Sequence, residues 1–192
     1  SLIDTASFFL GGKLPGNATL DGISGATPLD SIRIQLGQMR TMTEIMAAAP
    51  FDGVAGRGWQ WINLAALAGG LWLLKTKTIR WHIPVAMLTA LGGLQLIFFA
   101  FDPSTYASPT VALLSGGTML GAFFIATDPV SGATSNSGRL IFGAGIGVLT
   151  FTIRQWGAYP DGIAFAVLLM NMTAPLIDRY TLPRVYGERH RP

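Results

Sequence analysis

The sequence has no cysteine, and histidine and charge are scarce. Of its 192 residues only His82 and His190 are histidines, and 12% are Asp, Glu, Lys or Arg. The missing thiols exclude disulfides and Cys-ligated iron–sulfur clusters within this chain, and two histidines disfavour an ordinary zinc site or haem. If the chain carries electrons, it therefore needs an organic carrier. The net charge of +3 is small and scattered, so we expect no nucleic-acid partner.

Charge is missing altogether from several long apolar stretches. Half of the residues are hydrophobic and the mean hydropathy is +0.45. A helix of roughly 20 apolar residues crosses a hydrocarbon core about 30 Å thick. The sequence therefore predicts an all-α integral membrane protein with about five transmembrane helices. We expect these spans at residues 59–74, 83–101, 109–127, 140–157 and 162–178.

Glycine recurs inside the expected spans, as at Gly143, Gly145 and Gly147. Small residues allow helices to approach closely in lipid, which is the favoured interpretation. The alternative is that glycine pairs such as Gly116-Gly117 mark a flexible break in a helix.

Basic residues alternate between the predicted loops and so orient the spans. Loops 102–108 and 158–161 have no Lys or Arg, whereas the alternate segments are basic. The positive-inside rule then places the C-terminus in the cytoplasm and residues 1–58 outside, which is the periplasm of a Gram-negative cell. The basic residues are Lys75, Lys77, Arg80, Arg139, Arg179, Arg184, Arg189 and Arg191. The predicted domains are an external region, 1–58, a transmembrane domain, 59–181, and a cytoplasmic tail, 182–192.

The external region carries a helix start that could bind a phosphate. Thr27 is a favoured N-cap residue, Pro28 suits the first helical position, and Asp30 stands at capping-box spacing. A helix N-terminus offers free N–H groups to an anion. An amphipathic helix should follow over 28–48, ending at Pro50. The simpler alternative is an ordinary capped helix after a turn.

The residues before this helix resemble a recognition motif for covalent flavin attachment. The motif reads Asp21-x-x-Ser24-Gly25-Ala26-Thr27. Together with residues 127–131 and the apolar spans, it resembles the D subunit of the Rnf electron-transport complex. That protein is homologous to the B subunit of the sodium-translocating NADH:quinone reductase. The resemblance covers essentially the whole chain, which starts at Ser1 without an initiator Met or signal peptide, and we expect it to be part of a longer protein.

The resemblance implies a function and a set of partners. A flavin transferase would join the phosphate of FMN to Thr27 as a phosphoester, and members of the family also carry non-covalent riboflavin. The chain would be the C-terminal half of a ten-helix inverted-repeat domain in the bacterial inner membrane. It would pass electrons between the membrane, flavin and Fe–S subunits of a complex that couples ferredoxin:NAD⁺ oxidoreduction to Na⁺ or H⁺ movement. The resemblance implies no catalytic side chain and no metal site.

The motif occurs a second time, at residues 128–134, ending at Thr134. The charge pattern puts this copy in a cytoplasmic loop, whereas the transferase that the resemblance implies works on the outer side. We therefore predict Thr27 as the acceptor and Thr134 as a decoy. As a functional alternative, the second loop could bind a non-covalent flavin or face another subunit.

Polar residues inside the spans are further candidates, because they are costly in lipid. Arg154 either snorkels to the outer surface or meets the flavin phosphate, and Asn171 either bonds another helix or contacts an ion or quinone. Asp102 and Asp161 could each attract a cation, whereas Asp178 should neighbour Arg179 without a special role. The other polar candidates are Asn63, Gln95, Thr118, Thr150 and Thr173.

Aromatic residues near Thr27 could pack against a flavin ring, or simply anchor the membrane interface. They are Phe8, Phe9, Phe51, Trp59 and Trp61.

Two rival functions remain: half of a channel or transporter for a small solute, and a purely structural membrane subunit. The attachment motif at Thr27 separates them from the flavin hypothesis, because neither needs such an acceptor.

Overall fold

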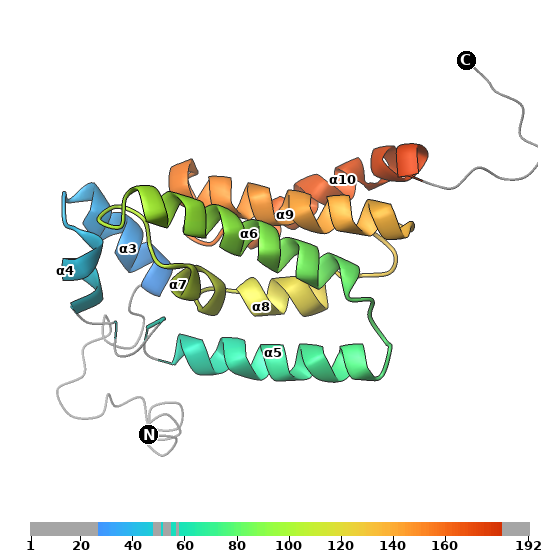
Figure 1. Ribbon diagram of the computed structural model, residues 1–192, viewed down its shortest axis with the longest axis horizontal. Helices are drawn as coiled ribbons and strands as arrows, with labels where there is room; N and C mark the ends of the chain where they lie inside the picture. Colours follow the sequence, from blue (N-terminus) through green and yellow to red (C-terminus); the bar gives the residue numbers. More distant parts are fainter. Residues whose placement is uncertain (1–26, 48–50, 52–54, 57, 182–192) are drawn as a thin grey trace, which may run out of the picture.

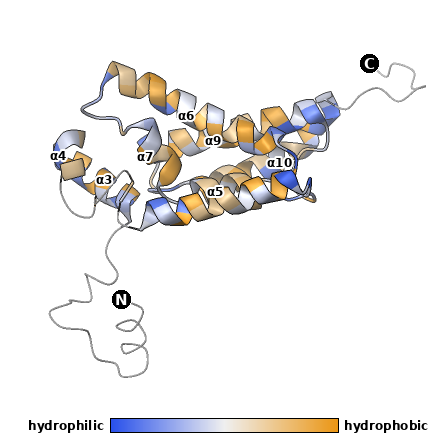
Figure 2. Cartoon of the chain, turned by 60° about the horizontal axis from the view of Figure 1, so that its bottom comes forward, coloured by the Kyte–Doolittle hydropathy of each residue, from blue (hydrophilic) through white to orange (hydrophobic). Residues whose placement is uncertain are grey.

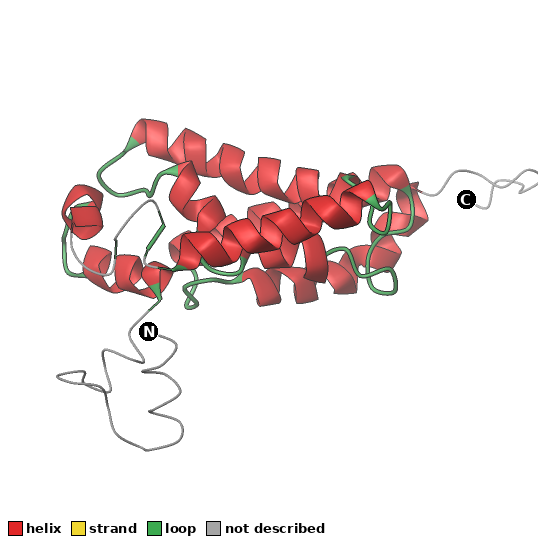
Figure 3. Ribbon diagram, turned by 90° about the horizontal axis from the view of Figure 1, so that it is seen from below, coloured by secondary structure: helices red, strands yellow, loops and turns green. Residues whose placement is uncertain are grey.

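A computed structural model describes the chain except for residues 1–26, 48–50, 52–54, 57 and 182–192. The described part is helical throughout and contains no strand, so the all-α prediction is confirmed for it (Figure 3). The elements are α3 (Pro28–Gly37), α4 (Met42–Ala47), α5 (Trp59–Lys75), α6 (His82–Phe101), α7 (Pro109–Leu114), α8 (Thr118–Leu120), the π-helical turn η1 (Gly121–Ile125), α9 (Asn136–Trp156) and α10 (Ile163–Thr181).

Four of the five predicted spans coincide with the single helices α5, α6, α9 and α10. Of the described helices, only α6 is both long and apolar enough to cross a membrane by length and composition alone. α5 falls just short because it has 17 residues. The number of membrane crossings therefore stays a prediction.

The helices form a bundle with α6 and α9 side by side (Figure 1). α10 packs against α9, and the segment α7–α8–η1 lies between α6 and α5. α3 and α4 lie at one end of the bundle, next to α7 (Figure 1). The core contains Met87, Phe142 and Ile146, all fully buried.

Glycine explains how closely α6 and α9 approach. A Cβ added at Gly143 would lie 2.5 Å from the carbonyl oxygen of Ile83, and one at Gly147 would lie 2.5 Å from that of Met87. Both obstacles are backbone atoms, so neither can move away easily. The packing interpretation of these glycines is therefore confirmed.

The third predicted span, 109–127, is not one continuous helix. α7 ends at Leu114, Ser115 is extended with ψ 156°, and Gly116 has a left-handed φ of 61°. The chain then resumes as α8 and passes directly into η1. The expectation of a single helix over 109–127 was wrong, and the alternative that Gly116-Gly117 marks a break in a helix is correct in its position. Ser115-Gly116-Gly117 can leave the helical conformation easily, and its freed polar groups find partners elsewhere in the fold.

The predicted amphipathic helix over 28–48 is also divided in two. α3 ends at Gly37, Met39 adopts a left-handed φ of 63°, and α4 begins at Met42. Glycine is a weak helix former, so Gly37 favours an end to α3, and residues 38–41 connect the two helices. Pro50, the predicted end, lies outside the described residues.

Hydrophobic residues run along the helices of the bundle (Figure 2), and many of them are exposed. Large hydrophobic side chains are exposed on several helices, including Trp61 on α5, Phe101 on α6 and Met172 on α10. A surface of this kind is typical of contact with lipid or with other subunits.

Candidate functional site

Thr27 caps α3 as the sequence predicts. Its backbone is extended, with φ −61° and ψ 155°, and its Oγ accepts a hydrogen bond from the Asp30 N–H at 3.3 Å. Pro28 occupies the first turn, and Thr27 itself is exposed. The other motif residues, Asp21, Ser24, Gly25 and Ala26, lie outside the described residues.

The first turn of α3 rests on the break between α7 and α8. A Cβ at Gly116 would lie 2.7 Å from the Cδ1 of Leu29, and a Cβ at Gly56 would lie 2.3 Å from the Cγ of Pro28. The Ser115 hydroxyl donates to the carbonyl of Ala55 at 3.0 Å. Thr27 is thus held next to the predicted span that the structure shows to be broken.

Asn63 of α5 satisfies the backbone at this break. Its side-chain N–H groups donate to the carbonyls of Leu114 and Gly116, each at 2.9 Å. Its Oδ1 accepts from the Met119 N–H at 3.2 Å. Because Asn63 is buried, these bonds replace those that a continuous helix would have made.

Arg154 of α9 binds the other side of the break. Its Nη1 donates to the Ala112 carbonyl at 2.8 Å and its Nη2 to the Thr118 hydroxyl at 3.0 Å. The same Nη2 forms an ion pair with Asp161, whose second carboxylate oxygen accepts from the Gly117 N–H at 2.8 Å. The Arg154 side chain is only 6% exposed. The snorkelling expectation was wrong, because partners inside the bundle hold the guanidinium.

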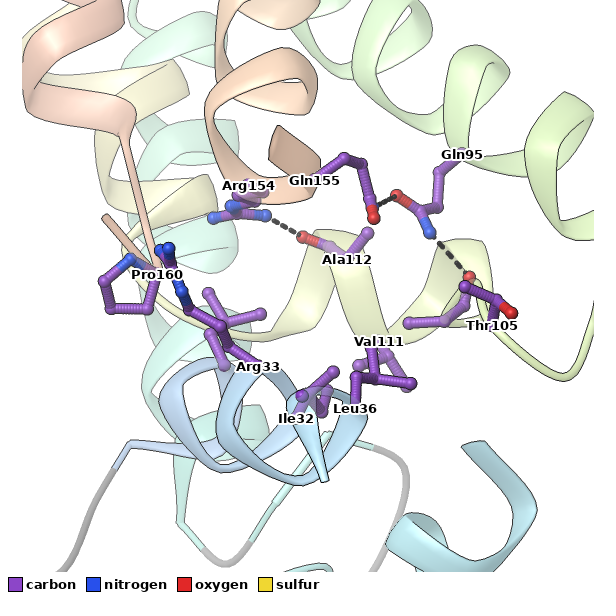
Figure 4. Close-up of a pocket in the computed structure, with 13 residues that line it drawn as sticks. Ile32, Arg33, Leu36, Gln95, Thr105, Val111, Ala112, Arg154, Gln155 and Pro160 are labelled. Carbon is purple, nitrogen blue, oxygen red and sulfur yellow. Dashed lines mark hydrogen bonds between the residues drawn. The ribbon is translucent and has the colours of Figure 1, made fainter. Parts of the chain in front are cut away.

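A cavity of about 260 Å³ lies between α3 and the bundle (Figure 4). On its bundle side, Gln155 donates to Gln95 at 3.3 Å, and Gln95 donates to the Ala107 carbonyl at 2.7 Å. Arg33 of α3 also lines it, and its Nη1 is buried without a hydrogen-bond partner among the described residues. The remaining lining is Leu29, Ile32, Leu36, Gly37, Thr105, Val111, Ala112, Arg154 and Pro160.

Thr134, at the end of the second motif, has its hydroxyl engaged. The Thr134 Oγ1 donates to Asp178 Oδ2 at 2.9 Å, and its N–H donates to Oδ1 at 2.9 Å. Asp178 therefore connects this loop to α10. The expectation that Asp178 has no special role missed this connection. Asp128 accepts from the hydroxyl of Ser131 at 2.7 Å and from its N–H at 3.0 Å. These bonds hold the pKa of the Asp128 carboxyl below its ordinary value.

The remaining candidates lie apart from one another. Hydrogen bonds from the side chains of Ser104 and, to a smaller extent, Thr105 hold the pKa of the Asp102 carboxyl below its ordinary value. The Oδ1 of Asn171 is buried with no partner in the described part of the chain, so its predicted interhelical bond is not seen there. Nowhere in the described ranges do three His, Asp or Glu side chains gather as metal ligands would.

The aromatic candidates differ in burial and do not gather at one site. Phe51 packs in a small core with Ile32 and Ile45, whereas Trp61 is 68% exposed. Neither lines the cavity beside α3. Phe8 and Phe9 lie outside the described residues.

Sequence reasoning missed the joint role of Asn63, Arg154 and Asp161. Asn63 and Arg154 were noted as costly polar groups and Asp161 as a carboxylate that could attract a cation, but none of them as a partner of the same backbone break. The available signal was Ser115-Gly116-Gly117 within an otherwise apolar span. Such a break must be compensated from other helices when no water is present.

Comparison with known proteins places the chain in a family. It is 55% identical to a Vibrio cholerae protein named as the D subunit of an ion-translocating oxidoreductase complex, over 97% of this chain and 56% of that protein. It is 58% identical to the protein of the same name from Escherichia fergusonii, over 88% of this chain and 49% of the relative. The chain therefore spans about half the length of the curated relatives it matches. The profile of the NQR2, RnfD, RnfE family matches residues 5–187, and the chain belongs to that family.

Proposed function

We propose that this chain is the flavin-bearing membrane part of the D subunit of an ion-translocating oxidoreductase complex of the Rnf type. Thr27 would carry FMN through a phosphoester bond on the periplasmic side of the inner membrane. The observation that carries the proposal is the exposed Thr27 at the N-cap of α3, at the end of the Asp-x-x-Ser-Gly-Ala-Thr sequence.

The surroundings of Thr27 suit a phosphate ester. The Thr27 Oγ already lies beside the free N–H groups of the first turn of α3, which is ten residues long. Those N–H groups and the helix dipole stabilise negative charge at this point. A phosphate on Thr27 would therefore reinforce the helix start rather than disrupt it.

The hydroxyls of Thr27 and Thr134 have different hydrogen-bond partners, and the difference favours Thr27 as the site of a phosphoester. The Thr134 hydroxyl is hydrogen-bonded to Asp178, whose negative charge would repel an incoming phosphate. Among the described residues, the Thr27 hydroxyl bonds no carboxylate and accepts only a backbone N–H. This contrast supports Thr27 as the acceptor independently of the predicted topology.

The flavin supplies the redox chemistry, accepting and releasing electrons, while the protein provides its position and electrostatic setting. The chain anchors the helix start beside Thr27, because Leu29 packs against Gly116 at the break between α7 and α8, and Pro28 packs against Gly56. Partner subunits of the complex, including flavin and Fe–S subunits, would deliver and remove electrons, coupled to Na⁺ or H⁺ transport. A flavin transferase would act during maturation.

In-gel flavin fluorescence of the denatured chain tests this function. The chain is co-expressed with a flavin transferase as wild type, Thr27→Ala and Thr134→Ala. We expect a fluorescent band in wild type and Thr134→Ala, and none in Thr27→Ala. A band that is lost only in Thr134→Ala would reverse the assignment. The absence of any band, with a control substrate labelled, would refute covalent attachment.

The transporter hypothesis has one structural argument in its favour, because discontinuous helices line the binding sites of many transporters. Here, however, the carbonyls of Leu114 and Gly116 accept hydrogen bonds from Asn63. Arg154 likewise covers the carbonyl of Ala112. Since the chain itself satisfies these groups, we assign the break a structural role.

A further inference from the structure

We propose that the cavity beside α3 receives the isoalloxazine ring of the flavin proposed at Thr27, and that Arg33 is the positive charge that stabilises the ring when it is reduced. This inference rests on the proposed function and adds to it the location of the ring and the residue that sets its potential. It follows from the position of the cavity, its lining and the guanidinium of Arg33, whose buried Nη1 has no partner among the described residues.

The cavity begins where the attachment point lies. Leu29, Arg33 and Leu36 of α3 form part of one wall, and α3 starts immediately after Thr27. Residues four apart on a helix lie on the same face, so Leu29 and Arg33 project to the same side. A chain attached at Thr27 and running along this face enters the cavity. Its volume of about 260 Å³ is slightly below the roughly 300–1,000 Å³ range of small-molecule sites.

The lining suits a flat ring with one polar and one apolar end. Gln95, Gln155 and Thr105 offer amide and hydroxyl groups that can bond the carbonyl and imide groups of a flavin. Ile32, Leu36 and Val111 supply apolar surface for the rest of the ring. Figure 4 shows the two glutamines on the bundle side and the apolar residues on the side of α3 and α7.

Charge distinguishes Arg33 from the other arginine of the cavity. Arg154 is neutralised by Asp161, whereas the described residues form no ion pair with Arg33. The buried Nη1 of Arg33 has no acceptor among them, which is costly unless a ligand supplies one. A flavin ring gains negative charge on reduction, and a nearby cation in a partly dehydrated site stabilises that charge. Arg33 should therefore raise the reduction potential of the flavin.

A redox titration of the flavin absorbance in the purified full chain tests this role. The variants are Arg33→Gln, which removes the charge, and Arg33→Lys, which keeps it. Arg40→Gln is the matched control, because Arg40 is an exposed arginine that does not line the cavity. We expect Arg33→Gln to weaken the reduced form about tenfold relative to the oxidised form, equivalent to about 59 mV for one electron. Arg33→Lys should lower the reduction potential less than Arg33→Gln does, and Arg40→Gln should have the wild-type potential.

The outcomes separate this inference from the proposed function. A fluorescent wild-type band with no change of potential in Arg33→Gln would overturn the role of Arg33 and leave covalent attachment intact. A wild-type chain without the band would refute the proposed function itself. Acrylamide quenching of the flavin in the folded chain is the second readout. Quenching as strong as in the denatured chain would place the ring in solvent and overturn the cavity assignment.

Discussion

The side-chain amide of Asn63 lies 2.9 Å from the carbonyl oxygen of Gly116, a residue 53 positions further along the chain. This bond joins α5 to the break between α7 and α8. With the bonds of Asn63 to Leu114 and Met119, it replaces the internal bonds of a continuous helix. The break is therefore a built feature of the bundle and not a frayed helix end.

Replacing Asn63 by Leu should destabilise the chain. Two carbonyls and one N–H would lose buried partners, and an unsatisfied buried group costs about 1–3 kcal/mol. Thermal unfolding in detergent, followed by helical circular dichroism, measures the loss. Thr89→Ala is the control, since it removes only intrahelical bonds of an exposed side chain. If both variants melt like wild type, the break does not depend on Asn63.

Removing the Arg154 side chain should have a larger effect. Arg154→Leu leaves Asp161 without its cation, and breaking a buried ion pair costs about 3–5 kcal/mol. We expect a loss near the lower end of this range, because the Asp161 side chain is 41% exposed. The double variant Arg154→Leu/Asp161→Asn should recover part of the loss, since no unpaired carboxylate remains. The same unfolding assay tests this, and a double variant less stable than the single one would contradict it.

The contact between α6 and α9 should tolerate no side chain at Gly147. Gly147→Ala places a Cβ 2.5 Å from the Met87 carbonyl oxygen, and overpacking of this kind costs about 1–3 kcal/mol. Gly93→Ala is the matched control, because nothing lies within 4 Å of its Cβ position. Alanine is favoured over glycine in helices by about 1 kcal/mol, so the control should be neutral or stabilised. Equal melting temperatures for the two variants would refute the packing argument.

The orientation of the chain can be tested by cysteine labelling without removing native thiols, since the sequence has none. Thr43→Cys in α4 and Val130→Cys in the second motif place thiols at exposed positions. We expect a membrane-impermeant maleimide to label Thr43→Cys in intact spheroplasts and Val130→Cys only in inverted vesicles. Labelling of both from the same side would contradict the predicted topology.

Several features of this protein depend only on neighbouring residues and could be predicted from the sequence. The Thr27 cap, the proline after it and the positions of α5, α6, α9 and α10 follow from local preferences and apolar stretches, which act within a few turns. The same local reasoning failed for 109–127 and 28–48. In both segments the apolar pattern continues through residues whose backbone leaves the helix.

The pairing of polar groups, in contrast, depends on how the helices pack. Arg154 and Ala112 are 42 positions apart, and Thr134 and Asp178 are 44 apart. No local rule selects such partners, because any of several polar groups in neighbouring helices has suitable chemistry. Which groups become partners depends on the relative positions of the helices, which follow from the close packing of α6 against α9 and from the break after α7. A buried polar group away from water must then take the partner that this packing places within reach.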